Sequence, residues 1–116
     1  MAWIMAYAGA VPTSKKAEYL EHAARMAEIF KKHGATRIVE TWGEAVPPGE
    51  VTSFPIAVQA GEDETVVMGW QEWPDRATQE TNFQKAMQDP AMGSMGDVPI
   101  NGKTMIFAGF DVLTDI

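Results

Sequence analysis

Apolar positions along the chain follow two spacings, one typical of strands and one typical of a helix. Residues 3–11 form an apolar run that favours a buried strand. Farther on, apolar side chains recur every three or four positions, as they do in a helix with one buried face: Leu20, Ala23, Ala27 and Phe30. The pattern therefore predicts a strand followed by a helix over residues 14–33.

The ends of this helix carry their own signals. Thr13 or Ser14 is a suitable residue to cap its first turn. The basic cluster at residues 31–33 falls in the last turn, where cations suit the negative end of the helix dipole, and Gly34 is a typical stop. This position explains the cluster without invoking a binding role.

The middle of the chain predicts strands joined by turns. Residues 36–42 are rich in β-branched and aromatic types and predict a second strand. A loop rich in proline and glycine follows at residues 43–53, and we expect it to be exposed. Two further strands are predicted over residues 54–60 and 65–73, separated by a turn at 61–64.

A second helix and a last strand complete the pattern. Asp75 is the expected cap of this helix, Phe83 and Met87 mark its inner face, and it ends at residues 89–90. Residues 90–102 are irregular, and the final strand covers about 103–112. The order predicts one α+β domain over residues 1–116, with the ferredoxin-like βαββαβ arrangement plus an extra strand. Its antiparallel sheet would carry both helices on one face.

Both faces of this sheet are apolar in the predicted strands. In the last strand Ile106 and Phe110 point one way and Phe107 the other, and the strand at 65–73 shows the same two-sided pattern. Two helices cover only one face, and the other face of such a sheet is normally polar. We therefore expect a second copy of the chain to cover the second face and form a homodimer.

Four segments resemble one known family in their order and spacing: GATRIVETWGEAVP, VVMGWQEWPD, FQKAMQDPAM and NGKTMIFAGFD. They are similar to the YbaA-like family of small bacterial proteins, and the resemblance covers nearly the whole chain. It implies the dimeric α+β barrel superfamily, in which two ferredoxin-like subunits press their sheets together. That superfamily includes cofactor-free monooxygenases, haem-degrading, dechlorinating and muconolactone-type enzymes, and amino-acid-binding regulatory modules. Membership does not select among these functions.

Composition excludes several classes of partner and chemistry. The net charge of −7 disfavours nucleic acid, including the signal-recognition-particle RNA to which some members of the resembled family are linked by label. The chain has no cysteine, which excludes disulfides and thiolate chemistry and fits a cytoplasmic protein. No apolar run approaches the length of a membrane helix, so no membrane partner is expected.

The sequence contains no motif for covalent, metal or nucleotide chemistry. No glycine-rich phosphate loop or nucleophile elbow is present, so no cofactor is predicted. The two histidines, His22 and His33, have no metal-site spacing and are predicted on the surface of the first helix; haem is only a weak alternative. Any enzymatic reaction must therefore depend on acid–base groups in a pocket.

Two Trp–Glu pairs supply candidate groups. Glu40 shares a strand face with Trp42, and Glu72 shares one with Trp70, on strands that are candidate neighbours in the sheet. A carboxyl group among aromatic rings has a raised pKa and can act as a general base near neutral pH. We therefore take Glu72 and Glu40 as candidate catalytic residues, and Arg37, Trp42 and Trp70 as candidate ligand-binding residues.

Two functions from different classes remain open. In the first, a pocket lined by Trp42, Trp70 and Glu72 binds a small apolar or aromatic molecule and supports cofactor-free monooxygenase-like or isomerase-like chemistry. In the second, the chain is a non-catalytic dimeric binding or regulatory module, and Glu40 or Glu72 only pairs with Arg37 or Arg76 at the interface. Within the first, we expect Trp70 to be core and Glu72 to be partly buried and paired near the mouth of the pocket.

Overall fold

The computed structural model describes residues 2–116 as two layers, a sheet and a set of helices. The elements in chain order are β1 (Trp3–Pro12), α1 (Lys16–Lys32), β2 (Arg37–Glu40), α2 (Phe54–Ala57), β3 (Glu64–Trp73), α3 (Arg76–Met87), α4 (Pro90–Gly93) and β4 (Ile106–Asp111). The four strands form one antiparallel sheet in the order β2-β3-β1-β4. The predicted α+β, ferredoxin-like fold is confirmed.

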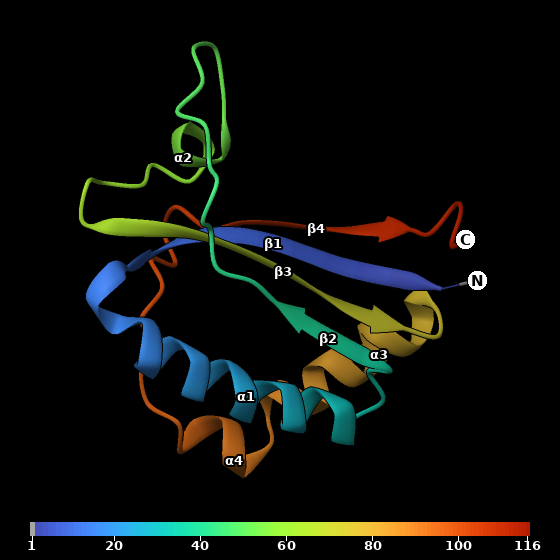
Figure 1. The fold of residues 1–116 in the computed structure, drawn as a ribbon. Coiled ribbons are helices and arrows are strands. Elements are labelled where there is room, and N and C mark those ends of the chain that lie inside the picture. The colour runs from blue at the N-terminus through green and yellow to red at the C-terminus, as the bar shows by residue number, and fades with distance from the viewer. Residues whose placement is uncertain (1) are drawn as a thin grey trace.

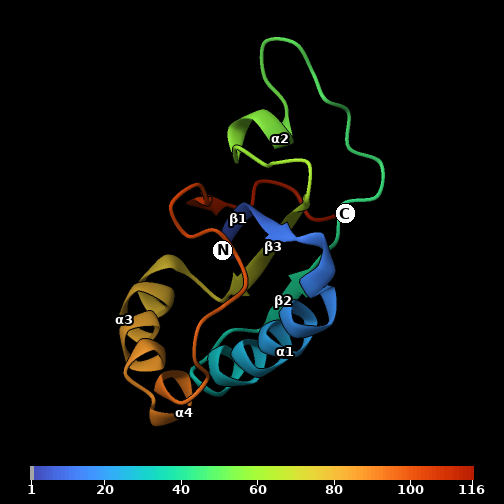
Figure 2. The ribbon, with the colours of Figure 1, turned by 90° about the vertical axis from the view of Figure 1, so that its left-hand side faces the viewer.

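The two faces of the sheet have different surroundings. Helices α1, α3 and α4 lie against one face, which we call the helix face (Figure 1). The view in Figure 2 shows α2 and its connecting segments on the opposite side, which we call the open face. The strand register puts Ala6, Met68 and Ala108 on the open face, and it confirms the predicted two-sided pattern of β3 and β4.

The extra strand predicted over residues 54–60 is wrong, because this segment forms the short helix α2. Ser53 caps it by accepting a hydrogen bond from the Ile56 backbone N–H at 3.2 Å, and Pro55 stands in the first turn, where its missing N–H costs nothing. Val58, just after the helix, is fully buried. The apolar composition of the segment therefore reflects one buried side chain and a cap, and without this strand the topology is βαββαβ.

Helix α1 lies within the predicted range 14–33 but starts later than predicted. The helix begins at Lys16 after a 3-10 turn, Thr13–Lys15, and neither Thr13 nor Ser14 caps it. The Thr13 hydroxyl instead lies 2.7 Å from that of Thr65 on β3. The predicted end is confirmed, with basic residues in the last turn and Gly34 at a φ of 114°.

The predicted inner face of each helix is confirmed except at one position: Ala23 and Phe30 of α1 are buried as predicted. Leu20 is 65% exposed, whereas its neighbour Tyr19 is buried. Met87 is 47% exposed, and Ala86 is the buried residue at that point of α3. Phe83 does face inward, because its ring stacks on Phe30 with centroids 5.5 Å apart. The prediction is therefore wrong only at Leu20 and Met87, because a polar-tipped tyrosine and a small alanine occupy the inner positions there.

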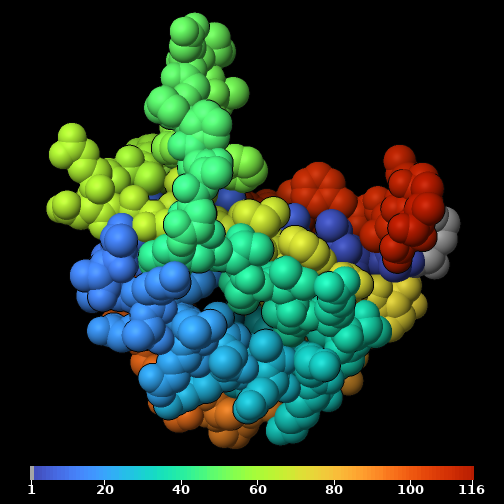
Figure 3. Space-filling view, in the orientation of Figure 1, coloured from blue at the N-terminus to red at the C-terminus, as the bar shows by residue number. Residues whose placement is uncertain are grey.

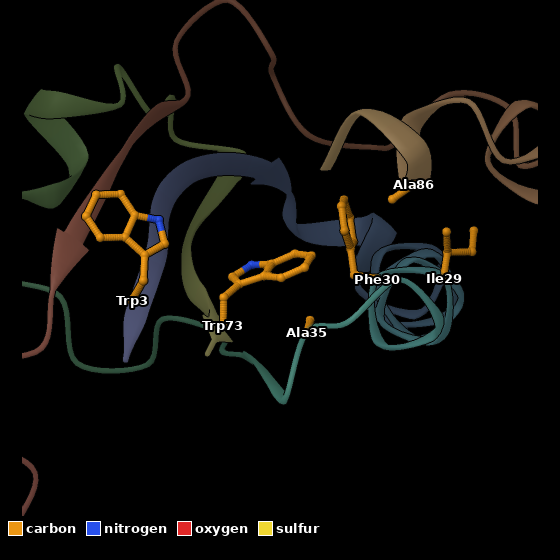
Figure 4. Packing of buried hydrophobic residues seen from close by; sticks show 6 residues of the cluster. All are labelled: Trp3, Ile29, Phe30, Ala35, Trp73 and Ala86. Atoms are coloured by element: carbon orange, nitrogen blue, oxygen red, sulfur yellow. The ribbon is translucent and has the colours of Figure 1, made fainter. Parts of the chain in front are cut away.

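The main core lies between the helix face and α1 and α3. Figure 4 shows the side chains of its buried cluster: Trp3, Ile29, Phe30, Ala35, Trp73 and Ala86. The edge of Phe30 meets Trp73 with centroids 6.4 Å apart. The Trp3 indole N–H donates to Gln79 of α3 at 3.2 Å, and its ring lies directly over Gly109 of β4. A side chain at position 109 would collide with that ring, so β4 can pack here only with glycine.

Two other expectations concern the exposed parts of the chain. The loop at residues 43–53 is exposed along nearly its whole length, as predicted. Among residues 2–116, no helix is both long enough and apolar enough to cross a membrane.

We predict that Trp73→Ala lowers the free energy of unfolding by roughly 3–5 kcal/mol, because Trp73 is 1% exposed and its loss leaves a cavity. Leu20→Ala is the control, since an exposed residue away from the core is expected to change stability by less than about 0.5 kcal/mol. Urea unfolding measures both values. Equal losses in the two variants would contradict this core.

Candidate functional site

Glu40 lies on the helix face, under α1. It is the last residue of β2 and pairs in register with Gly69 of β3. The hydroxyl of Tyr19, which α1 directs inward, donates a hydrogen bond to Glu40 Oε2 at 2.7 Å. The two residues come from different layers of the fold, so the position of this pair depends on the packing of α1 against the sheet.

Burial changes the acidity of both partners. It raises the pKa of Glu40 from its ordinary 4.5 to about 7, because removal from water disfavours the carboxylate. It raises the pKa of Tyr19 from 10.0 to about 12 for the same reason. Near neutral pH, Glu40 thus exchanges its proton readily while Tyr19 remains a hydrogen-bond donor.

Aromatic side chains surround this pair. The ring of Trp42 lies 6.3 Å from that of Tyr19, and Lys16 Nζ stands 5.3 Å from the centre of the Trp42 ring. On the sheet side, the Tyr7 hydroxyl lies over Gly69, only 2.6 Å from where a β-carbon at that position would stand. Gly69 therefore leaves room for the Tyr7 ring beside the strand that carries Glu40.

The carboxyl group of the pair is half-buried, whereas Tyr19 is buried. Glu40 and Trp42 are each partly accessible rather than sealed in the core. Figure 3 shows a hollow between α1, in blue, and the chain around β2, in teal. The site under α1 thus combines a carboxyl group whose pKa lies near 7 with the Tyr19 hydroxyl and the Trp42 ring, groups that are typical of small-molecule sites.

The second predicted pair, Trp70 and Glu72, lies on the other face of the sheet. The Trp70 indole N–H donates to Glu72 Oε2 at 2.9 Å, and Arg37 Nη1 lies 3.5 Å from the same oxygen. The Glu72 side chain is 29% exposed, so it is partly buried and paired, as expected. Trp70 is half-buried on the open face, which corrects its prediction as a core residue.

The prediction of a single pocket lined by Trp42, Trp70 and Glu72 is therefore wrong. The strands β2 and β3 are neighbours, as the prediction requires, but Glu40 and Trp42 face α1 whereas Trp70 and Glu72 face away from it. Alternation along each strand fixed which residues share a face within that strand. It did not fix how the two strands align, and the register puts Arg37, not Glu40, beside Glu72.

A hollow of about 260 Å³ lies on the open face, and it contains little chemistry. Its lining is almost wholly apolar: Ala6, Tyr7, Ala8, Phe54, Met68, Ile106, Phe107, Ala108 and Phe110. It is open to solvent, and neither Trp70 nor Glu72 lines it. No carboxylate or imidazole borders it. The hollow is therefore better suited to contact with an apolar surface than to catalysis of a reaction.

The histidines have structural surroundings that the sequence did not indicate. His22 was predicted on the helix surface but is buried, with Nε2 3.4 Å from the Gly96 carbonyl oxygen. His33 Nε2 lies 2.8 Å from Asp89 Oδ2, and Lys32 Nζ contacts the same oxygen at 3.0 Å. Hydrogen bonds from His33, the Ala91 backbone and Lys32 hold the pKa of Asp89 well below its usual range. This cluster fastens the start of α4 to the end of α1.

The described residues 2–116 show no group of three His, Cys, Asp or Glu side chains placed to hold a metal ion.

Tyr7 and Tyr19 were not among the predicted site residues. Tyr7 is four residues from Trp3 on the same strand and hence on the same face, and Tyr19 stands four residues before the buried Ala23. Both periodicities are present in the sequence. A tyrosine at an inner position of a strand or helix is the signal that indicates these two residues.

Comparison with known proteins places the chain in a family. Residues 2–102 match the family described as "Protein of unknown function (DUF1428)". The chain is 44% identical over 116 residues to the uncharacterized protein YbaA of Escherichia coli strain K12, covering 99% of both chains. The chain belongs to this family. The resemblance of the four sequence segments to YbaA-like proteins is thereby confirmed.

Solved structures of more distant proteins share the fold. SnoaB, a cofactor-independent oxygenase from Streptomyces nogalater, is similar with a TM-score of 0.61 at 13% identity, over 99% of this chain and 96% of that one. A dimeric ferredoxin-like protein from an uncultured marine organism gives a TM-score of 0.57 at 12% identity and covers both chains fully. At these identities the similarity concerns the fold alone.

We predict that the burial of Glu40 makes stability depend on pH in a definite direction. The folded chain keeps the Glu40 proton up to about pH 7, whereas the unfolded chain releases it near 4.5. The folded state thus binds more protons between these values, and stability falls as pH rises through this window. Glu40→Gln should remove a fall on the order of 2–3 kcal/mol, measured by urea unfolding from pH 4.5 to 8.

The matched control is Glu44→Gln, which alters a solvent-exposed residue outside the core. It should keep the slope of the wild-type protein. A Glu40→Gln protein with the same slope as wild type would show that Glu40 does not hold its proton to neutral pH.

Proposed function

We propose that this chain of 116 residues acts as one domain that binds a small aromatic molecule between α1 and the sheet and removes a proton from it with Glu40. The observation that carries the proposal is the half-buried Glu40, with a pKa of about 7, held at 2.7 Å by the Tyr19 hydroxyl. A general base is most effective when its pKa lies near the working pH. The reaction class is cofactor-free monooxygenase-like or isomerase-like chemistry.

The two acidic groups have separate roles in this proposal. Glu40 as carboxylate accepts a proton from an activated C–H or O–H of the substrate. Tyr19, whose pKa is about 12, keeps its proton and holds the carboxylate in place through its hydrogen bond. The two environments thus make Glu40 the base and Tyr19 the hydrogen-bond donor. The same division of roles occurs in other sites where the pKa values of two groups differ widely.

The anion formed by this step has two outcomes that need no bound cofactor. Return of the proton to a different carbon is an isomerisation, with no change in oxidation state. Reaction of the anion with dissolved O₂ converts a CH₂ group to a carbonyl, with one oxygen atom in the product and the other released as water. The shared fold with SnoaB, a cofactor-independent oxygenase, supports the second outcome without assigning any residue.

Trp42 and Tyr7 provide the walls for an aromatic substrate. Trp42 packs with Tyr19, the partner of the carboxyl group, and Tyr7 lies over Gly69, the register partner of Glu40. Flat rings of this kind favour a flat ligand through stacked or edge contacts. Trp70, Glu72 and Arg37 lie outside this site and take no part in the proposed reaction.

The same proposal includes a homodimer formed through the open faces. The chain exposes 7580 Å², whereas a compact monomer of 12.7 kDa exposes roughly 6,200 Å². The excess of about 1,300 Å² exceeds the roughly 800 Å² that each partner buries in a standard interface. The dimeric ferredoxin-like protein that shares the fold supports this assembly. A cytoplasmic location, expected from the absence of cysteine, belongs to the proposal too.

A non-catalytic binding or regulatory module is the second candidate, and one observation favours it. The hollow of about 260 Å³ on the open face is apolar and has no acid–base group at its edge. If that hollow were the working site, the dimer would bind an apolar molecule there without changing it. The two candidates place their ligands on opposite faces of the sheet, so variants of one face separate them.

We predict that the wild-type protein accelerates proton exchange at the CH₂ group between the ring and the carbonyl of 2-tetralone, a small aromatic ketone, in deuterated buffer. The rate should rise with pH through a midpoint near 7, as Glu40 ionises. Glu40→Gln should lower it by about 10²–10⁴-fold. The same change on the other face, Glu72→Gln, should have little effect. Proton NMR follows the exchange.

Native mass spectrometry of protein purified gently from its host complements this assay, since it shows whether a ligand accompanies the dimer. Loss of a co-purified aromatic ligand in Glu40→Gln supports the site under α1. An unchanged exchange rate in Glu40→Gln would remove Glu40 as the base. A ligand lost on changing Phe110 rather than Glu40 would favour the non-catalytic candidate.

For the dimer, we predict that sedimentation at micromolar concentration gives twice the mass of the chain. Phe110→Glu should produce a folded monomer, because Phe110 is 51% exposed on the open face of the isolated chain. Leu20→Glu, the same kind of change on the outer side of α1, should leave the dimer intact. A well-folded wild-type monomer under these conditions would contradict the proposed assembly.

A further inference from the structure

A stiff projection stands on the open face, and neither the sheet nor the proposed reaction explains it. It consists of residues 44–62, between β2 and β3, and includes α2; we call it the arm. Figures 1 and 2 show it rising from the sheet on the side opposite α1 and α3. The space-filling view in Figure 3 shows its tip, in green, well clear of the rest of the molecule.

Local interactions hold the arm in one shape. The Ser53 hydroxyl donates to the Pro48 carbonyl oxygen at 2.8 Å and also caps α2. Gly49 has a φ of 68°, and a β-carbon there would collide with the Thr52 carbonyl oxygen. Pro47 and Pro48 restrict the backbone further. The turn is therefore ordered by its own backbone before anything binds to it, which lowers the entropic cost of binding.

The arm presents apolar side chains to solvent. They are Val46 at 36%, Val51 at 95%, Phe54 at 52% and Ile56 at 44% exposure. Single exposed apolar residues are common on protein surfaces, but four on one rigid projection are typical of an interaction surface. Phe54 also lines the hollow on the open face together with Ile106 and Phe110, so the arm and the sheet form one continuous apolar surface.

We propose that the arm holds a second copy of this chain, with its apolar side chains resting on the partner that covers the open face. The proposal rests on the homodimer described above, and it identifies the arm as the element that binds the partner. Each copy brings both an upright arm and a bare stretch of sheet, so a two-fold axis can pair the arm of one with the surface of the other. The excess exposed area of about 1,300 Å² is enough for an interface that includes both.

Charge disfavours the other occupants of such a surface. Between Arg37 and Arg76 the chain has no Lys or Arg, and the arm itself carries Glu44, Glu50 and Glu62. Nucleic acids and anionic lipid surfaces bind basic segments, so neither matches this one. A second copy, by contrast, offers an apolar sheet surface on its open face.

The test uses the absence of cysteine from the natural chain. Val51→Cys introduces a single thiol at the tip of the arm, and a benzophenone maleimide attached there reacts on illumination with whatever lies beside it. We expect a covalent product of two chains from this variant, with the link mapped by mass spectrometry to the partner's strands or arm. Leu20→Cys, treated in the same way, should give no such product.

A second measurement determines how much the arm contributes. Val51→Glu should raise the dimer dissociation constant at least tenfold in a sedimentation dilution series. The monomer fold should not change, because Val51 is 95% exposed and supports nothing in it. Leu20→Glu should leave the constant unchanged.

The possible outcomes distinguish a failure of the arm proposal from a failure of the proposed function. A dimer that Phe110→Glu dissociates, but in which Val51→Cys gives no inter-chain product and Val51→Glu has no effect, would overturn the arm and keep the sheet-face dimer. A monomeric wild-type protein would overturn both interfaces and leave the Glu40 exchange assay as an independent test of the reaction.

Discussion

A four-stranded sheet has two faces, and the long helices of this chain cover only one of them, while the short helix α2 covers part of the other. That imbalance organises the molecule, because the side chains of both faces are largely apolar. Burial of apolar surface is the main favourable contribution to folding. On the helix face it comes from a compact aromatic core in which Trp3, Trp73 and Phe30 join the sheet to α1 and α3. On the open face a smaller buried cluster joins the sheet to Val58, just after α2, and the rest of that face is available for another function.

The helix face also carries the chemistry, at some cost in stability. Placing Glu40 under α1 removes a carboxyl group from water and raises its pKa to about 7, so ionisation in the folded state is penalised. The Tyr19 hydroxyl at 2.7 Å offsets part of that penalty. A purely structural position would be filled more stably by an apolar residue of similar size. An unfavourably buried carboxyl group of this kind is typical of functional sites. This burial distinguishes Glu40 from Glu72, which forms a solvent-accessible ion pair with Arg37.

Much of the fold could be predicted from the sequence, because periodicity is a local property. The spacing of apolar residues located α1 and both long strands, and the apolar character of both strand faces indicated the uncovered side of the sheet. The errors arose where a tertiary contact decided the outcome. Residues 54–60 contain apolar types suited to a strand, but Ser53 and Pro55 favour a helix start, and burial of Val58 completes it. Leu20 is more apolar than Tyr19, yet the inner position belongs to Tyr19 because its hydroxyl reaches Glu40.

The candidate site was predicted in part for the same reason. Alternation correctly grouped Glu40 with Trp42 and Glu72 with Trp70, since side-chain direction within one strand has a period of two. Whether two strands present their groups to the same side depends on their register, which no single strand encodes. The register of β2 with β3 placed one pair under α1 and the other on the open face. The Tyr7 ring can lie beside Glu40's strand pair because Gly69 has no side chain. This relation can be recognised only when the pairing of the strands is known.

The four tryptophans allow the central claim, that the two faces have separate roles, to be tested directly. Trp3, Trp42 and Trp73 lie on the helix face, and Trp70 alone lies on the open face. Fluorine NMR of protein labelled with 5-fluorotryptophan, with each resonance assigned by a Trp→Phe variant, can be recorded over a dilution series. The account predicts that the Trp70 resonance alone moves as the dimer dissociates, while the other three stay in place. Movement of all four resonances together, or of Trp73 rather than Trp70, would contradict it.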